Sequence, residues 1–243
     1  MNNRVNRRPH LLLLWVVCSC ASAQTMTVEF DATAEAQLSP LEKSVINQIA
    51  QDTDVEVRAL LPQMPRDVKV TVSVGTDVIP ETGTGAASLE PGHIVWIVDA
   101  SRPEGVVEIA RSNLRSALFH EMHHLARGWV ITGGAPVTTI MDAVVSEGMA
   151  TVFERDFADS EPLWGSYPDN IEEWVEELLA LPASALGLYE QWIFQHPDGR
   201  RWIGYRSGTF IVDRAVAKSG MSAAELVLTS TDEVLDLAGL DEL

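Results

Sequence analysis

One segment restricts the fold of this chain most strongly, because it combines a helical apolar stripe with a run of histidines. Segment 105–128 and the residue after it carry apolar side chains at intervals of four, four, three and four: Leu114, Leu118, Met122, Leu125 and Trp129. Such intervals place side chains on one face of an α-helix. The sequence therefore predicts a helix over 105–128 whose apolar face packs on a protein core.

Beside this stripe, the sequence His-Glu-Met-His-His at 120–124 matches the pattern HExxH. His120 and His124 lie about 40° apart around an ideal helix, so both imidazoles reach one metal ion. Glu121 then points toward a water molecule on that ion, where a carboxylate acts as general base. The motif predicts a catalytic zinc site. The alternative is a solvated helix face whose polar residues share no role.

A catalytic zinc ion takes three protein ligands and leaves one position for water, so a third donor is needed. In the expected helix over 139–157, Glu147 shares a face with Ile140 and Val144. Its carboxylate therefore lies on an otherwise buried face, where a metal is the partner that makes the charge tolerable. Gly148 beside it allows the two helices to approach closely. We expect Glu147 to be the third zinc ligand.

Other polar residues near the motif have structural explanations. Asp142 is the alternative third ligand, but Thr139 to Asp142 fits a capping box, which explains this carboxylate without a metal. His123 lies about 100° from His124 around the helix, so we interpret it as a residue behind the ligands or on the surface. Tyr205 has two interpretations, as a hydrogen-bond donor to the oxyanion of a hydrolysis or as a core residue at the start of a helix.

Three more single residues and one cluster of glutamates have structural interpretations. Thr151, one turn after Glu147, is either a hydrogen-bond partner of a ligand or an ordinary helical residue. His93 and His196 lie next to turn signals, and we interpret both as structural. The glutamates at 172–177 are expected to form the solvated face of a helix over 170–181.

The rest of the chain predicts an α+β fold. A Ser-Pro pair at 39–40 signals the start of a helix that ends near Leu61. Alternating or short apolar runs predict strands, at 68–74, 94–98 and, as a further edge strand, 83–89. From residue 105 onward the pattern is helical, at 105–128, 139–157, 170–181, 205–218, 222–228 and 231–238. We expect a small N-terminal β-sheet lobe, the HExxH helix and a mostly helical C-terminal lobe, all within one domain over 24–243.

The first residues are typical of an export signal. Three arginines precede a short apolar run at 11–17, and Ala21-Ser22-Ala23 supplies the small residues that signal peptidase cuts. We expect residues 1–23 to be a signal peptide and the mature protein to be periplasmic or secreted. In the alternative, Cys20 lies in a lipobox and becomes a lipidated N-terminus. Both cysteines lie in this leader, so cleavage after Ala23 leaves histidines and carboxylates as the metal ligands.

The charge balance excludes one class of partner. The chain has 35 acidic and 17 basic side chains, a formal charge of −18, so no basic surface is available to bind nucleic-acid phosphates. No apolar run reaches the roughly 18–20 residues that span a bilayer, so we expect no transmembrane span in the mature chain. A peptide or protein substrate is the expected partner.

The two helices together resemble a known family. HEMHH at 120–124 followed by SEGMA at 146–150 resembles the bacterial domain-of-unknown-function proteins described as predicted zinc-dependent proteases, which join HExxH to a later Glu-Gly-x-Ala helix. The likeness extends over about 90–238 and includes Gly-Tyr-Arg-Ser-Gly at 204–208. It implies a zincin-like metallopeptidase domain with a gluzincin-like site. The implied zinc ligands are His120, His124 and Glu147, and the implied base is Glu121.

The sequence thus predicts an exported zinc metallopeptidase that hydrolyses peptide bonds through a zinc-bound water, with Glu121 as general base. One of the strands over 86–98 is expected to form the edge along which an extended substrate pairs. The alternative is a secreted or surface zinc-binding protein without turnover, and a third interpretation is an exported acidic scaffold without metal. Glu121 separates the first two, because a site that only holds zinc has no use for a base.

Overall fold

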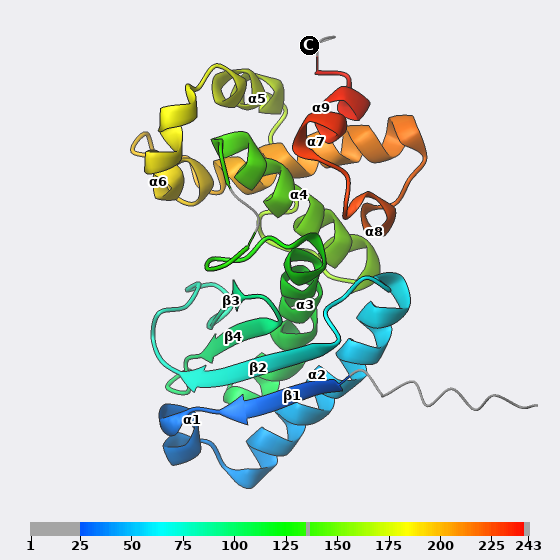
Figure 1. Ribbon diagram of the computed structural model, residues 1–243. Helices are drawn as coiled ribbons and strands as arrows, with labels where there is room; N and C mark the ends of the chain where they lie inside the picture. The colour runs from blue at the N-terminus through cyan, green and yellow to red at the C-terminus, as the bar shows by residue number, and fades with distance from the viewer. Residues whose placement is uncertain (1–24, 135–136, 241–243) are drawn as a thin grey trace, which may run out of the picture.

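A mixed sheet of four strands forms the first lobe of the chain (Figure 1). The computed structural model describes residues 25–134 and 137–240. Strand β1 (Thr25–Phe30) lies at one edge and pairs in parallel with β2 (Asp67–Val74), β2 pairs in parallel with β4 (His93–Val98), and β3 (Thr84–Glu90) pairs with β4 in the antiparallel sense. In spatial order the strands are β1, β2, β4 and β3. β3 is thus an edge strand, as the sequence predicts.

Two long helices pack against this sheet and against each other, α2 (Pro40–Leu60) and α3 (Val106–Arg127). Alternate residues of the central strands are buried in the core that the helices share, among them Val70 and Trp96. Such alternation buries one face of a sheet. α3 therefore lies with one side on the sheet and presents its other side to the second lobe (Figure 1).

The second lobe is built around α4 (Ile140–Phe157), which lies between α3 and α7 (Ile203–Ser219). Gly148 of α4 and Gly208 of α7 face each other so closely that a Cβ atom on either would overlap backbone of the other helix. Glycine is the residue that permits such an approach. This contact holds the middle of α4 close to the middle of α7.

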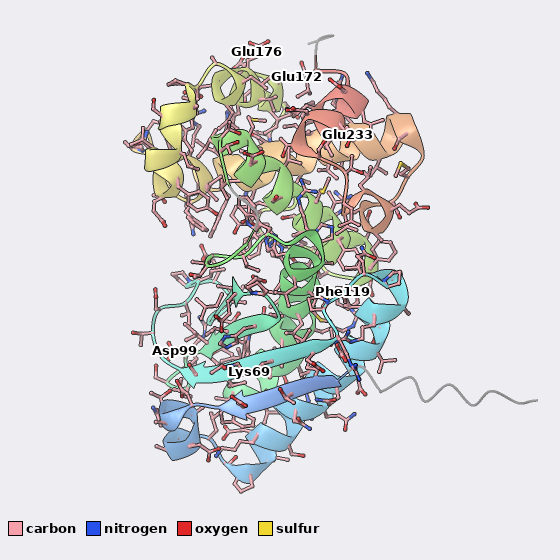
Figure 2. All side chains as sticks on the ribbon, in the orientation of Figure 1. Lys69, Asp99, Phe119, Glu172, Glu176 and Glu233 are labelled. Carbon is pink, nitrogen blue, oxygen red and sulfur yellow. The ribbon has the colours of Figure 1, made fainter. Side chains whose placement is uncertain are left out.

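Short helices complete the second lobe: α5 (Ile171–Leu179), a 3-10 helix η1 (Ala183–Leu188), α6 (Tyr189–Ile193), α8 (Ala223–Leu226) and α9 (Thr231–Ala238). Glu172 and Glu176 of α5 and Glu233 of α9 lie at the outer end of this lobe (Figure 2). On α5 the glutamates at 172, 173 and 176 are exposed while Val175 and Leu178 are buried. This is the solvated helix face that the sequence predicts.

The predicted strands and long helices are present, but some elements were not predicted. β1 and the short helix α1 (Ala32–Gln37) precede the first predicted helix, and α6 and η1 lie in a segment for which no helix was expected. β1 is stabilised by pairing with β2, which follows only after α2, so no local pattern identifies it. α7 begins at Ile203 instead of Tyr205.

The predicted signal peptide over 1–23, with Cys20, lies outside the described residues. Within the described residues, no helix combines the length and the apolar character needed to cross a membrane.

Candidate metal centre

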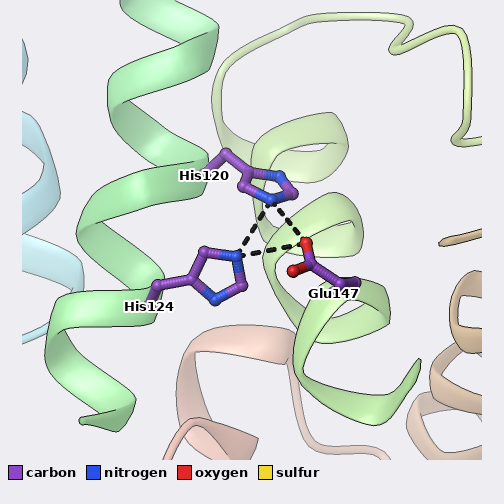
Figure 3. A group of neighbouring side chains, drawn as sticks. All are labelled: His120, His124 and Glu147. Carbon is purple, nitrogen blue, oxygen red and sulfur yellow. Dashed lines mark hydrogen bonds and ion pairs between the residues drawn. The ribbon is translucent and has the colours of Figure 1, made fainter. Parts of the chain in front are cut away.

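Three buried side chains from α3 and α4 converge where the two helices meet (Figure 3). The Nε2 atom of His120 lies 3.1 Å from Nε2 of His124 and 3.1 Å from Oε2 of Glu147. Nε2 of His124 lies 3.2 Å from the same carboxylate oxygen. His120 and His124 reach this point because they are one turn apart on α3, and Glu147 reaches it from the middle of α4. The three donor atoms form a nearly equilateral triangle.

This triangle has the dimensions of a metal site. Donors about 2.0–2.1 Å from a tetrahedral zinc ion lie about 3.3 Å from one another, close to the separations found. Two imidazole nitrogens and a carboxylate oxygen are zinc donors, and a histidine that gives up its Nε2 proton offers a lone pair to a cation. Within the described parts of the chain, this is the one group of three or more such residues able to hold a metal ion.

The charges around the triangle also suit a cation. Glu121, Glu147 and Glu154 are all buried, and together they surround two imidazoles. Burial acts to lower the pKa of His120, but hydrogen bonds with Glu147 and Glu154 outweigh it and raise this pKa to about 10. Burial acts to raise the pKa of Glu147, but His124 and His120 hold it below its usual value. The buried carboxylates therefore stabilise a positive charge at this point, whether it is a proton on His120 or a bound cation.

Glu121 stands beside the triangle and is held by the sheet. The Ser88 hydroxyl, on edge strand β3, lies 2.8 Å from the Glu121 carbonyl oxygen and 2.9 Å from its Oε2. Ser88 is 4% exposed and Glu121 is 7% exposed. No local sequence pattern indicates this contact, because it depends on β3 lying against α3. The Glu121 carboxylate is thus fixed next to the donor triangle without being part of it.

A second buried carboxylate orients one of the histidines. Oε2 of Glu154 lies 3.2 Å from Nδ1 of His120, on the far side of the ring from Glu147. Burial raises the pKa of Glu154, although His120 opposes that effect. A carboxylate on the second ring nitrogen fixes the tautomer and orientation of a metal-binding histidine. Sequence reasoning missed Glu154, although its position two turns after Glu147 on the same helix was a usable signal.

Two tyrosines approach the triangle from the helical lobe. The hydroxyl of Tyr189 donates to Oε1 of Glu147 over 3.5 Å, and Tyr205 also hydrogen-bonds to Glu147. Burial and the nearby carboxylates raise the pKa of both phenols, so both are neutral donors at ordinary pH. Tyr205 was a candidate on sequence grounds. Tyr189 was not, because it lies in a helix that the sequence did not predict.

The remaining candidates lie outside the triangle. Asp142 accepts hydrogen bonds from the backbone N–H groups of Thr138 and Thr139 and forms the capping box at the start of α4, as predicted. His123 is fully buried, with Nε2 3.4 Å from the Ala223 carbonyl oxygen, so its interpretation as a surface residue is wrong. The helical lobe covers this face of α3, which the spacing alone does not reveal.

Three more predicted positions have simple outcomes. The Thr151 hydroxyl is buried and has no hydrogen-bond partner among the described residues, so it makes no hydrogen bond to a ligand side chain. His93 contacts Thr71 and Glu90, and His196 contacts Gln191 and Asp198. Both histidines thus take part in contacts away from the triangle.

The sequence over 40–236 matches the model of a protein family described as predicted Zn-dependent protease, DUF2268. The chain belongs to this family. The matched residues of this DUF2268 protein include the whole donor triangle together with Glu121 and Glu154. None of the curated proteins matches the chain.

Two cavities of this DUF2268 protein meet at the donor triangle. The first, here called the apolar cavity, has a volume of about 480 Å³ and is lined by His124 and Glu147. The second, here called the polar cavity, has a volume of about 560 Å³ and is lined by His120 and Glu154. Glu121 lines both. The candidate metal centre is therefore open to a ligand from two sides.

Proposed function

We propose that the protein is an exported zinc metallopeptidase with a zincin-like site, in which His120, His124 and Glu147 hold zinc. The observation that carries this proposal is the pairing of a donor triangle of zinc-site dimensions with a separate, fixed carboxylate at the same opening. The family description and the two cavities at the site support it. Export rests on the sequence of residues 1–23.

The chemistry divides between the metal and the protein. Zinc held by His120, His124 and Glu147 would supply a Lewis acid for the carbonyl oxygen of the scissile bond and for a water molecule. Glu121 accepts at its carboxylate a proton from the water whose oxygen bonds to the carbonyl carbon, and it gives that proton to the amine nitrogen as the C–N bond breaks. The hydroxyl of Ser88 orients the Glu121 carboxylate for both transfers.

The tyrosines complete the proposed mechanism. Tyr189 and Tyr205 place neutral hydroxyl donors beside Glu147, and both tyrosines line the apolar cavity. Such donors stabilise the negative charge that develops on the carbonyl oxygen. Tyr205 lines both cavities and lies closer to the path of a ligand that crosses the site, so we assign it this role.

Edge strand β3 offers a place for the substrate main chain. The carbonyl of Ser88 already accepts from the N–H of Ile131, and the carbonyl of Thr84 accepts from the N–H of Ile79. Between them, the main-chain groups of Ala86 face away from β4 and have no main-chain partner in the described residues. An extended peptide that pairs with Ala86 passes directly by the metal centre, because Ala86 lines both cavities.

Glu121 favours an enzyme over a protein that only binds zinc. A storage or structural site gains nothing from a non-ligating carboxylate beside its three donors, and burying one is costly. The test uses Glu121→Gln with Glu108→Gln as its control, since Glu108 is an exposed glutamate on the same helix. We expect both variants to retain about one zinc per chain. Glu121→Gln lowers the rate of peptide hydrolysis by at least about a hundredfold, and Glu108→Gln leaves it unchanged.

Two outcomes contradict the proposal. If the zinc-loaded protein cleaves nothing in a broad mixture of peptides, the protein binds zinc without turnover. If Glu121→Gln cleaves as fast as the unaltered protein, the assigned base is wrong. A chelator must abolish the activity and zinc must restore it for either comparison to count.

A further inference from the structure

The two cavities at the metal centre differ in chemistry. The apolar cavity is walled by Trp129, Val130 and Ile131, which follow α3, and by Leu186 and Phe194 from the helical lobe. These side chains belong to two separate segments of the chain. A volume of about 480 Å³ accommodates one large side chain together with the adjoining main chain.

The charges of the apolar cavity all have one sign. Its charged lining residues are Glu121, Glu147 and Glu190, and none of its described lining residues is a lysine or arginine. Zinc bound at His124 and Glu147 would offset part of this negative charge, but Glu190 adds a further carboxylate that an anionic side chain meets in the cavity. An aliphatic or aromatic side chain instead removes apolar surface from water on both partners.

The polar cavity on the other side of the centre presents a different surface. It is lined along α3 by Arg111, Ser112, Asn113, Arg115 and Ser116, and across from them by Glu81 and Glu161. Charges of both signs and several hydroxyl and amide groups give no single side-chain type an advantage. For a peptide that crosses the centre, the apolar cavity therefore favours apolar side chains, whereas the polar cavity accepts side chains of different types.

Strand β3 fixes how a peptide crosses. β3 runs from the polar cavity, lined by Thr84 and Gly85, to the apolar cavity, lined by Ala87 and Ser88. Antiparallel pairing is the more stable arrangement of two strands. An antiparallel peptide at Ala86 has its N-terminal part on the side of the apolar cavity. The residue that precedes the scissile bond then lies at the apolar cavity.

The mouth of the apolar cavity is apolar too. Ile131 is 71% exposed there, and its N–H donates to the Ser88 carbonyl, which holds the segment against β3. Leu186 of η1, which also lines the cavity, is half-buried. Exposed aliphatic side chains at the rim of a cavity are typical of a surface that receives an apolar ligand.

We propose that the apolar cavity is a side-chain subsite, and that the substrate is an extended polypeptide segment with a large aliphatic or aromatic residue immediately before the scissile bond. This inference rests on the proposed peptidase function and names the substrate class of that same site. Acidic residues are rejected at this position, and the residue after the bond is selected only weakly.

The first experiment maps cleavage. The zinc-loaded protein is incubated with a mixed peptide library, and cleavage positions are read by mass spectrometry. We expect large apolar residues before the cleaved bond, with kcat/KM about tenfold to a hundredfold above that for alanine, because a buried apolar side chain gives discrimination of this size. Equal tolerance at this position, or an apolar preference only after the bond, overturns the proposal.

The second experiment ties the preference to the cavity. Ile131→Glu adds a charge at the mouth, and Val55→Glu is the matched control, since Val55 is 72% exposed on α2 in the other lobe. Zinc content and thermal unfolding confirm that both variants are folded. We expect Ile131→Glu to reduce the preference for apolar over alanine residues at least about fivefold and Val55→Glu to leave it unchanged. An unchanged preference in Ile131→Glu overturns the assignment of the subsite.

A binding measurement separates this inference from the peptidase function. Calorimetry on zinc-loaded Glu121→Gln compares acetylated hexapeptides of alanine and serine that contain a single leucine, alanine or glutamate at the same position. We expect the leucine peptide to bind at least about tenfold more tightly than the alanine peptide, and the glutamate peptide more weakly than both. This result without any cleavage by the unaltered protein contradicts the peptidase function and retains the subsite. Cleavage without any apolar preference contradicts the subsite and retains the peptidase function.

Discussion

The hydroxyl of Ser88 lies 2.8 Å from the main-chain carbonyl oxygen of Glu121 and 2.9 Å from its Oε2. One side chain of the sheet thus contacts both the backbone and the carboxylate of the proposed base. The same strand carries the open main-chain groups of Ala86. Strand β3 therefore positions the proposed base and would also position a substrate that pairs with it.

Ser88→Ala is expected to lower kcat while zinc content stays near one per chain. Loss of a hydrogen bond to a charged group costs about 1.5–3 kcal/mol, which corresponds to about a tenfold to hundredfold fall in rate. Ser44→Ala is the control, since Ser44 is exposed on α2. Steady-state kinetics and metal analysis measure both. If Ser88→Ala loses zinc instead of rate, Ser88 supports the fold of the centre and not the base.

Glu147→Gln is expected to weaken zinc retention strongly, because the amide removes the anionic donor from the triangle. Asp142→Asn tests the other carboxylate of α4, and it should cost only the stability of a helix cap, about 1 kcal/mol. Titration with a competing chelator ranks the zinc affinities, and urea unfolding measures the stabilities. The opposite ranking of affinities moves the third ligand to Asp142.

Glu154→Gln is expected to lower zinc affinity about 10- to 100-fold, the usual effect of losing a carboxylate behind a ligating histidine. The geometry behind this is the 3.2 Å contact between Oε2 of Glu154 and Nδ1 of His120. Glu161→Gln is the matched control, because Glu161 is exposed close by in sequence. Chelator competition reads both variants. Equal affinities for the two variants contradict the role of Glu154.

Much of the metal centre was accessible from the sequence because it depends on local spacing. His120 and His124 are one turn apart in an HExxH motif, and Glu147 lies on the buried face of another predicted helix, so the motif and the helical periodicity together indicated them. Asp142 was recognised as a cap for the same reason. Residues whose role depends on the packing of distant segments were missed, above all Ser88 and Tyr189.

The same distinction holds for the fold. The helices that became α2, α3 and α4 were predicted close to their observed ends, since caps and apolar stripes are local signals. β1 depends on pairing with β2 across an intervening helix, and the burial of His123 depends on α8, which lies a hundred residues later. Contacts of that range leave no trace in a short window of sequence.

Gly148→Ala is expected to destabilise the protein by at least about 1–3 kcal/mol, because the added methyl overlaps the backbone of Gly208 and forces α4 and α7 apart. Gly187→Ala is the control, since nothing lies within 4 Å of a Cβ placed there. Loss of a flexible residue should make that variant equally stable or slightly more stable. Urea unfolding of both decides, and a neutral Gly148→Ala contradicts the close packing of the two helices.

Export predicts a defined mature N-terminus. Protein recovered from an exporting host should begin at Gln24, or at a lipidated Cys20 if the lipobox is used. Cys20→Ser distinguishes the two, because it abolishes lipid attachment and leaves signal-peptidase cleavage in place. Intact mass and N-terminal sequencing give the answer. A chain that keeps Met1 in the cytosolic fraction contradicts both routes.

The donor triangle takes two of its corners from α3, which packs on the sheet, and the third from α4, which packs on α7. An ion held there ties the two halves of the molecule together. The pair of histidines alone offers too few ligands for tight binding, so the halves must dock before the ion is retained. Retention of the ion would then depend on the packing of α4 against α3 as well as on the three donor side chains.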